Sequence, residues 1–126
     1  MTEKLTRILI AEDDDNNRIP LKMMLKMNGY EVIEACDGQQ ALDYIQRDKP
    51  DLVLMDISLP VIDGLEVTRL IRREAELQTL PIIFISGYEN QETLDRVKAC
   101  GGTGYISKPI EFDDLKQMIE KHLNAE

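Results

Sequence analysis

Acidic, hydroxyl and amine side chains stand at the ends of the apolar segments of this chain, at Glu12, Asp13, Asp56, Ser86 and Lys108. Three carboxylates that are brought together raise one another's pKa values unless a cation lies among them. Hard oxygen ligands with room for water and phosphate suit Mg²⁺. Such a metal can neutralise a phosphoryl group that arrives on one carboxylate, while a lysine and a serine contact the phosphoryl oxygens. These residue types therefore predict magnesium-assisted phosphoryl transfer if the fold brings their segments together.

Asp56 ends the stretch around which we expect the chain to be organised. The four consecutive apolar residues Leu52 to Met55 are typical of a strand that is buried on both faces. Pro60 has no N–H to contribute to a central strand, and Asp63-Gly64 is typical of a turn that starts a helix. Asp56 is therefore predicted at the carboxyl end of a strand, where open α/β sheets place their ligands. Taken alone, it is equally well explained as an acid that begins a loop.

Five strands are predicted, at Arg7–Ala11, Glu31–Ala35, Leu52–Met55, Ile82–Ile85 and Gly104–Ser107. They alternate with five helical patterns, which predicts a doubly wound α/β fold with a parallel sheet covered on both faces. The wholly apolar first, third and fourth strands are predicted to be central, and the more polar second and fifth to be edges. This ranking fits the order 2-1-3-4-5 that is common among flavodoxin-like sheets, although the residues themselves indicate only which strands are central and which are edges. Because parallel strands end at one edge, the five chemically active side chains are expected to converge.

A stripe of apolar residues at helical spacing predicts the first helix, and we assign this stripe to the core. Its members are Ile19, Met23, Met24 and Met27. Gly29 is placed to end the helix as a C-cap residue. Pro20 removes one hydrogen bond, so the helix is expected to begin near Asn16 or Asn17, or to kink.

Caps and spacing predict the other four helices. Asp37 and Gln40 predict a capping box for a helix over Gly38–Arg47, and the fourth helix covers roughly Asn90–Cys100. The third helix has apolar residues inside and arginines outside, and the fifth is amphipathic. The inward positions are Val67, Leu70 and Ile71 in the third helix and Leu115, Met118, Ile119 and Leu123 in the fifth, and the outward arginines are Arg69, Arg72 and Arg73.

Length and charge restrict the class of function. The 126 residues suffice for one domain that buries about two-thirds of its unfolded surface, and we expect a single domain over residues 1–126. A net charge of −9 repels nucleic acid and anionic membranes, so direct nucleic-acid binding is not expected. Residues 1–4 contain no apolar signal core, and no apolar run approaches the roughly 18 residues of a membrane span, which predicts a cytoplasmic location. Cys36 and Cys100 are expected to remain free thiols.

The combined motifs resemble the response-regulator receiver domains of two-component signalling. The resemblance covers nearly the whole chain and depends on Glu12-Asp13, Asp56, Pro60, Asp63-Gly64, Ser86-Gly87, Tyr105 and Lys108-Pro109. It implies that Asp56 accepts a phosphoryl group from a phosphohistidine of a sensor histidine kinase or histidine phosphotransfer protein. It also implies that Asp13, Asp56 and the Ser58 carbonyl ligate Mg²⁺, with Glu12 acting mostly through water. Glu12 replaces a more usual Asp, Ile62 replaces a frequent Met, and Pro20 interrupts the first helix, but no required group is lost.

The resemblance further implies how a signal leaves the domain. Ser86 and the loop Gly87 to Glu89 are expected to move toward the phosphoryl group, so that space opens beneath the fourth helix and Tyr105 rotates inward. The face made by the fourth helix, fifth strand and fifth helix is then expected to bind a downstream effector protein. Since the sequence ends at Glu126, we expect a stand-alone regulator similar to the chemotaxis type, either monomeric or dimerising on phosphorylation. It is expected to catalyse only its own phosphorylation and slow autodephosphorylation.

Other interpretations of the same residues fit less well. Phosphatases that form an aspartyl phosphate carry Asp-x-Asp at the nucleophile, whereas Ser58 stands at the second position here. An EF-hand loop beginning at Asp13 would have Arg18 at its glycine position and Met24 at its bidentate glutamate position. A receiver-like module that is not phosphorylated would have lost a site residue, and none is missing. His122, the only histidine, is expected in the last turn of a helix, where a cation suits the helix dipole.

Overall fold

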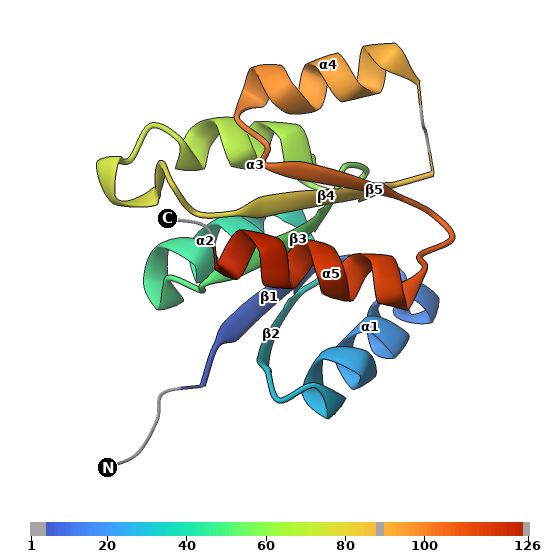
Figure 1. Ribbon diagram of the computed structural model, residues 1–126. Helices are drawn as coiled ribbons and strands as arrows, with labels where there is room; N and C mark the ends of the chain where they lie inside the picture. The colour runs from blue at the N-terminus through green and yellow to red at the C-terminus, as the bar shows by residue number, and fades with distance from the viewer. Residues whose placement is uncertain (1–4, 88–89, 125–126) are drawn as a thin grey trace.

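The computed structural model describes residues 5–87 and 90–124, and the expectations for residues 1–4, Tyr88 and Glu89 lie outside this part of the chain. Five parallel strands form one sheet in the order β2-β1-β3-β4-β5, which confirms the predicted order and its edge strands (Figure 1). The strands are β1 (Arg7–Ala11), β2 (Glu31–Ala35), β3 (Leu52–Asp56), β4 (Ile82–Ser86) and β5 (Gly104–Ser107). Asp56 and Ser86 are thus the last residues of their strands, each one position beyond the predicted strand end.

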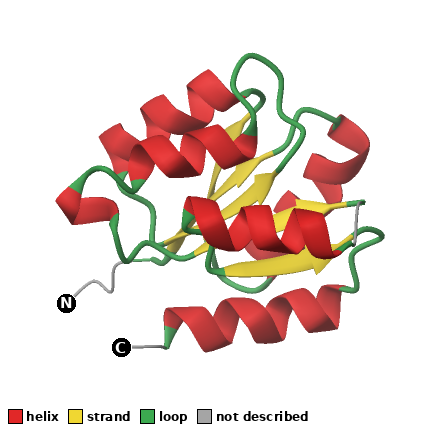
Figure 2. Ribbon diagram, turned by 90° about the horizontal axis from the view of Figure 1, so that it is seen from above, coloured by secondary structure: helices red, strands yellow, loops and turns green. Residues whose placement is uncertain are grey.

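Helices cover both faces of this sheet, and a view from above shows the strands as a layer between them (Figures 1 and 2). They are α1 (Asp15–Met27), α2 (Gly38–Asp48), α3 (Gly64–Ile71), α4 (Gln91–Cys100) and α5 (Phe112–Leu123), with a short 3₁₀ helix at Ala75–Leu77 that the sequence did not predict. The side chain of Asp37 accepts the N–H of Gln40 at 2.7 Å, which confirms the predicted cap of α2. Helix α1 begins at Asp15, one residue before the predicted start, with Pro20 inside it.

Two apolar clusters form the core, one on each face of the sheet. The cluster beneath α1 and α5 contains the strand residues Ile8, Ile10, Leu52, Leu54, Ile83 and Ile85. The cluster beneath α2, α3 and α4 contains the strand residues Leu9, Ala11, Val53, Met55, Ile82 and Phe84. Successive strand residues therefore enter opposite clusters, as the two-residue repeat of a strand requires. This double burial explains why the central strands have uninterrupted apolar sequences.

The register of the strands places the chemically active residues at one edge of the sheet. Ala11 pairs with Met55, so the residues that follow Ala11 lie beside the end of β3. Asp56 pairs with Ile85, and Ser86 pairs with Ser107. The carboxyl ends of β1, β3, β4 and β5 therefore meet, as expected for a parallel sheet.

The predicted core face of α1 is wrong. Ile19, Met23 and Met27 are exposed to 46%, 59% and 84%, whereas the buried residues of this helix are Leu21 and Leu25. Met24, the remaining member of the predicted stripe, is half-buried against the α1 and α5 cluster. Apolar residues occur around most of this helix, so its periodicity fits more than one face, and packing against β1 and β2 selects the leucine face.

The prediction that Arg72 lies on the outer face of the third helix is also wrong, because its guanidinium points inward. It donates hydrogen bonds to the backbone carbonyls of Gly101, Leu77 and Leu80, at 3.0, 2.6 and 2.7 Å. Its aliphatic stem fills the space beside Gly101, where a Cβ would lie 2.8 Å from Arg72 Cγ. Arg72 therefore links the end of α3 to the end of α4 and to the chain leading into β4.

The two cysteines are both free thiols. Cys36 is exposed and Cys100 is buried, which confirms the expectation that they do not pair.

Within residues 5–87 and 90–124, every helix is too short or too polar to cross a membrane.

We predict that Arg72→Met lowers the free energy of unfolding by about 2 kcal/mol, because it leaves partly buried carbonyls without their charged donor. Arg73→Met is the matched control, since Arg73 is exposed and the same change there is expected to have an effect within about 0.5 kcal/mol. Urea unfolding followed by circular dichroism measures both. Equal stabilities of the two variants would contradict the role assigned to Arg72.

Candidate functional site

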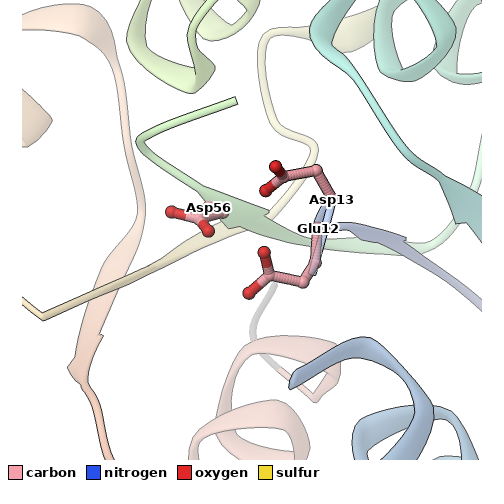
Figure 3. Close-up of side chains that lie close together, drawn as sticks. All are labelled: Glu12, Asp13 and Asp56. Atoms are coloured by element: carbon pink, nitrogen blue, oxygen red, sulfur yellow. The ribbon is translucent and has the colours of Figure 1, made fainter. Parts of the chain in front are cut away.

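Three carboxylates gather beyond the ends of β1 and β3, as Figure 3 shows. Glu12 and Asp13 directly follow β1, Asp56 ends β3, and each offers an oxygen within 4.8 Å of the others. Glu12 and Asp56 are only 3% and 6% exposed, whereas Asp13 faces solvent. The predicted convergence of these acids is therefore present in the structure.

Lys108 lies between two of these acids. Its Nζ is 3.0 Å from Glu12 Oε1 and 3.2 Å from Asp56 Oδ2. Its backbone N–H donates to the carbonyl of Ser86 at 2.8 Å, which holds the lysine beside the end of β4. Burial alone lowers the pKa of the ammonium, but the hydrogen bond to Glu12 and the charge of Asp56 raise that pKa above its usual value. The ammonium therefore stays charged and offsets part of the repulsion between the acids.

The loop after β3 folds back onto Asp56. The N–H of Ser58 donates to Asp56 Oδ1 at 3.0 Å, and the N–H of Gly64 donates to the carbonyl of Ile57 at 2.9 Å. A Cβ at Gly64 would lie 2.3 Å from the backbone oxygen of Asp56, so this approach requires glycine. Both carboxylate oxygens of Asp56 thus have a fixed donor, Ser58 on one side and Lys108 on the other.

Glu12 is held at its backbone and at both carboxylate oxygens. Its N–H donates to the carbonyl of Ala35 at 3.0 Å, and its Oε2 accepts the N–H of Asp14 at 3.3 Å, while Oε1 contacts Lys108. Burial, together with the neighbouring Asp56, raises the pKa of Glu12 to about 7, although Lys108 opposes this shift. Glu12 is therefore a buried participant in the cluster.

Ser86 and Tyr105 lie on β4 and β5. Ser86 is buried at the end of β4, at the same edge of the sheet as Asp56. Tyr105 is half-buried and packs against the cluster beneath α2, α3 and α4. Ser86 therefore lies at the edge of the sheet that carries Asp56, and Tyr105 lies on the face of the sheet covered by α2, α3 and α4.

One contact of the site was missed by the sequence analysis. The guanidinium of Arg18, in the first turn of α1, donates to the backbone carbonyl of Glu12 at 3.1 Å. The sequence signal was present, since a cation follows the acidic run by one helical turn, but spacing alone does not show which carbonyl it reaches.

The residues at this edge fit Mg²⁺. All three side chains of the cluster offer carboxylate oxygens, which are hard ligands for a small divalent cation. Asp13 is exposed, so water and a phosphate group have access from its side. Burial and the neighbouring Asp56 raise the pKa of Glu12 even though Lys108 opposes the shift, so the cluster favours additional positive charge. A divalent cation held by these carboxylates would supply such charge.

Comparison with known proteins decides the family. Residues 8–120 match the family described as the response regulator receiver domain. The chain belongs to this family. Receiver domains are the phosphoacceptor domains of two-component signalling, so the resemblance in the sequence is confirmed.

Several relatives of this receiver domain are informative. The polar-differentiation response regulator DivK of Brucella anthropi is 34% identical over 116 residues, which cover 92% of this chain and 94% of DivK. The solved structure of the chemotaxis protein CheY4 of Vibrio cholerae is 27% identical with a TM-score of 0.88, and the match covers 94% of this chain and 98% of CheY4. The receiver domain of the sensor histidine kinase PA1611 of Pseudomonas aeruginosa is 30% identical with a TM-score of 0.90, with 97% and 100% of the two chains covered. That structure holds a magnesium ion in its active-site cleft.

We predict that, without metal, the contribution of Glu12 to the free energy of unfolding of this receiver domain falls as pH rises from about 4.5 to about 7. Folding raises the pKa of Glu12 from 4.5 to about 7, so within this window the folded state binds more protons than the unfolded state, and its stability declines with pH. Glu12→Gln removes this contribution, so the variant is expected to gain stability relative to wild type as pH rises. Urea unfolding at several pH values in the presence of a chelator measures the difference.

The control for this prediction is Glu31→Gln, which removes an exposed acid at the start of β2. Its curve is expected to run parallel to that of wild type through the same pH window. Parallel curves for Glu12→Gln and wild type would show that Glu12 titrates as it does in the unfolded chain.

Proposed function

We propose that this receiver domain accepts a phosphoryl group on Asp56, with Mg²⁺, from a phosphohistidine of a sensor histidine kinase or histidine phosphotransfer protein. The observation that carries the proposal is the environment of the Asp56 carboxylate, which lies between the Lys108 ammonium and the Ser58 N–H, beside Glu12 and Asp13. Phosphoryl transfer needs positive charge and fixed donors around the reacting oxygens, and this edge of the sheet provides both.

In the proposed reaction, an oxygen of Asp56 forms a bond to phosphorus as the bond between phosphorus and the histidine nitrogen breaks. Lys108 and the hydroxyl of Ser86 bind phosphoryl oxygens, and the Ser58 N–H orients the attacking carboxylate. Asp13, Asp56 and the Ser58 carbonyl would hold Mg²⁺, with Glu12 acting mostly through water. When bound, the metal neutralises charge on the transferred group. The domain would catalyse only this transfer and the slow hydrolysis of its own aspartyl phosphate.

Exposed apolar side chains on α1 and in the loop after β3 support a protein donor. Ile19, Met23 and Met27 recur at four-residue spacing along the outer face of α1, which begins directly beyond the acidic cluster. Val61, in the loop after β3, is 78% exposed. Apolar side chains gathered on a surface are typical of contacts between proteins. They supply a contact surface that a small phosphodonor would not need.

The packing of helix α4 supports a role for this helix in passing on the signal. Its two buried residues, Val97 and Cys100, both lie near its C-terminal end, and the earlier turns contribute no fully buried side chain. A helix packed in this way can shift without dismantling a core. We propose that Ser86 and Tyr105 couple phosphorylation to the face made by α4, β5 and α5, and that this face binds a downstream effector protein. A partner that favours the phosphorylated state by 100-fold contributes about 2.7 kcal/mol more binding free energy to that state.

We predict that incubation with acetyl phosphate and Mg²⁺ adds one phosphoryl group to the wild-type chain and none to Asp56→Asn. The amide keeps the shape of the side chain but lacks the nucleophilic carboxylate oxygen. Asp51→Asn, the same change just before the opposite end of β3, is expected to be labelled like wild type. Intact-protein mass spectrometry gives the result, and labelling of Asp56→Asn would refute the assigned acceptor.

We predict that the phosphoryl mimic beryllofluoride changes NMR shifts of Tyr105 and α4 in wild type but only those around Asp56 in Ser86→Ala. The hydroxyl of Ser86 is the proposed link between the phosphoryl oxygens and β5, so its loss should confine the response to the edge of the sheet. Ser58→Ala removes an exposed hydroxyl but keeps the backbone N–H that contacts Asp56, and should respond like wild type. Wild-type shifts that never reach Tyr105 or α4 would refute the coupling.

A further inference from the structure

We propose that Arg18 is a positioning residue for the magnesium site, because its guanidinium holds the Glu12 carbonyl and thereby sets the place of Glu12 and Asp13. The inference rests on the proposed function, since it concerns the same site. Arg18 itself contacts neither the Asp56 carboxylate nor Lys108 among the hydrogen bonds found in the described residues.

The three donor nitrogens of Arg18 contact three different parts of the fold. Nη1 donates to the Glu12 carbonyl at 3.1 Å, Nε donates to Glu34 Oε1 on β2 at 3.1 Å, and Nη2 contacts Asp15 on α1. The side chain is only 12% exposed. The guanidinium is therefore enclosed between the end of β1, β2 and the first turn of α1.

Through these contacts, β2 holds both backbone polar groups of Glu12. The Glu12 N–H donates directly to Ala35, and the Glu12 carbonyl is held by Arg18, which is in turn anchored by the neighbouring Glu34. The carbonyl of Glu12 belongs to the peptide that joins it to Asp13. Holding both backbone groups of Glu12 therefore fixes the direction in which Asp13 enters the site.

The charge of Glu34 is secured by two cations. Lys22 Nζ lies 2.9 Å from Glu34 Oε2, one helical turn beyond Arg18. The hydrogen bond from Lys22 lowers the pKa of Glu34, burial opposes this, and the hydrogen bond from Arg18 lowers it again. Glu34 is therefore ionised near neutral pH and anchors the guanidinium through a charge-assisted bond.

Geometry distinguishes Arg18 from a simple positive charge. A guanidinium has a rigid planar fork of donors on three nitrogens, whereas a lysine ammonium carries its donors on a single nitrogen and cannot span the three acceptors that Arg18 contacts through separate nitrogens. A positive charge near the cluster would by itself repel Mg²⁺, so its removal would tighten metal binding. A positioning role predicts the opposite, namely that both Arg18→Lys and Arg18→Met weaken metal binding.

The test is calorimetric titration of the full chain with Mg²⁺. For Arg18→Lys and Arg18→Met we expect the dissociation constant to rise about 10-fold, the usual scale for losing a residue that supports metal ligands. Lys22→Met is the matched control, since it removes the other cation on Glu34 from the same helix and should bind Mg²⁺ within about twofold of wild type. At saturating Mg²⁺, labelling of Arg18→Lys by acetyl phosphate should return to the wild-type rate, which a general loss of structure would not allow.

Each outcome decides the inference. Wild-type affinity in Arg18→Lys, or tighter binding in Arg18→Met, would overturn it and leave the proposed function intact. If Arg18→Met does not fold, as judged by circular dichroism, Arg18→Lys decides alone because it keeps the charge. If wild type itself binds no Mg²⁺ and is not labelled, the proposed function fails, and this inference fails with it.

Discussion

The repulsion between carboxylates at the ends of β1 and β3 is the constraint on which this structure depends. Glu12 and Asp56 are nearly buried, and two desolvated acids at this distance are tolerated only with positive charge or a proton between them. The structure supplies Lys108 from the end of β5, on the far side of β4. The strand order therefore contributes to the charge balance of the site, because it places the Lys108 ammonium beside the carboxylates that follow β1 and end β3.

Most of the fold is predictable because the sheet has a simple physical signature. Strands buried on both faces have continuous apolar sequences, as in Leu52–Met55, and the more polar β2 and β5 are the edges. Helices are less well defined by sequence when their apolar residues are not confined to one face. Helix α1 shows this, because Leu21 and Leu25 are buried while Met23 and Met27 are exposed. Packing against the sheet determines which face of the helix is buried, and the spacing of its apolar residues does not.

The site was predictable to the extent that it depends on strand ends. A parallel sheet brings the backbones of Glu12, Asp13, Asp56 and Lys108 to one edge whatever their side-chain conformations, so strand order suffices to place these residues there. Contacts that depend on where a long side chain turns were not predictable. Arg72 reaches backbone carbonyls beyond α3 and Arg18 reaches the Glu12 carbonyl, yet both resemble ordinary solvent-facing arginines in the sequence. Every residue carries a backbone carbonyl, so the sequence does not indicate which carbonyl an arginine contacts, and these partners are identified only from the structure.

The attachment of α4 at one end has a mechanical consequence. Arg72 grips the carbonyl of Gly101 just after α4, and the buried residues of the helix lie near that same end. The 10 residues of α4 extend for about 15 Å at 1.5 Å per residue. A rotation of about 10° around the anchored end therefore sweeps the opposite end through about 2.6 Å, on this helical length. Any rotation of α4 about the end held by Arg72 therefore displaces its N-terminal end, at Gln91, further than any other part of the helix.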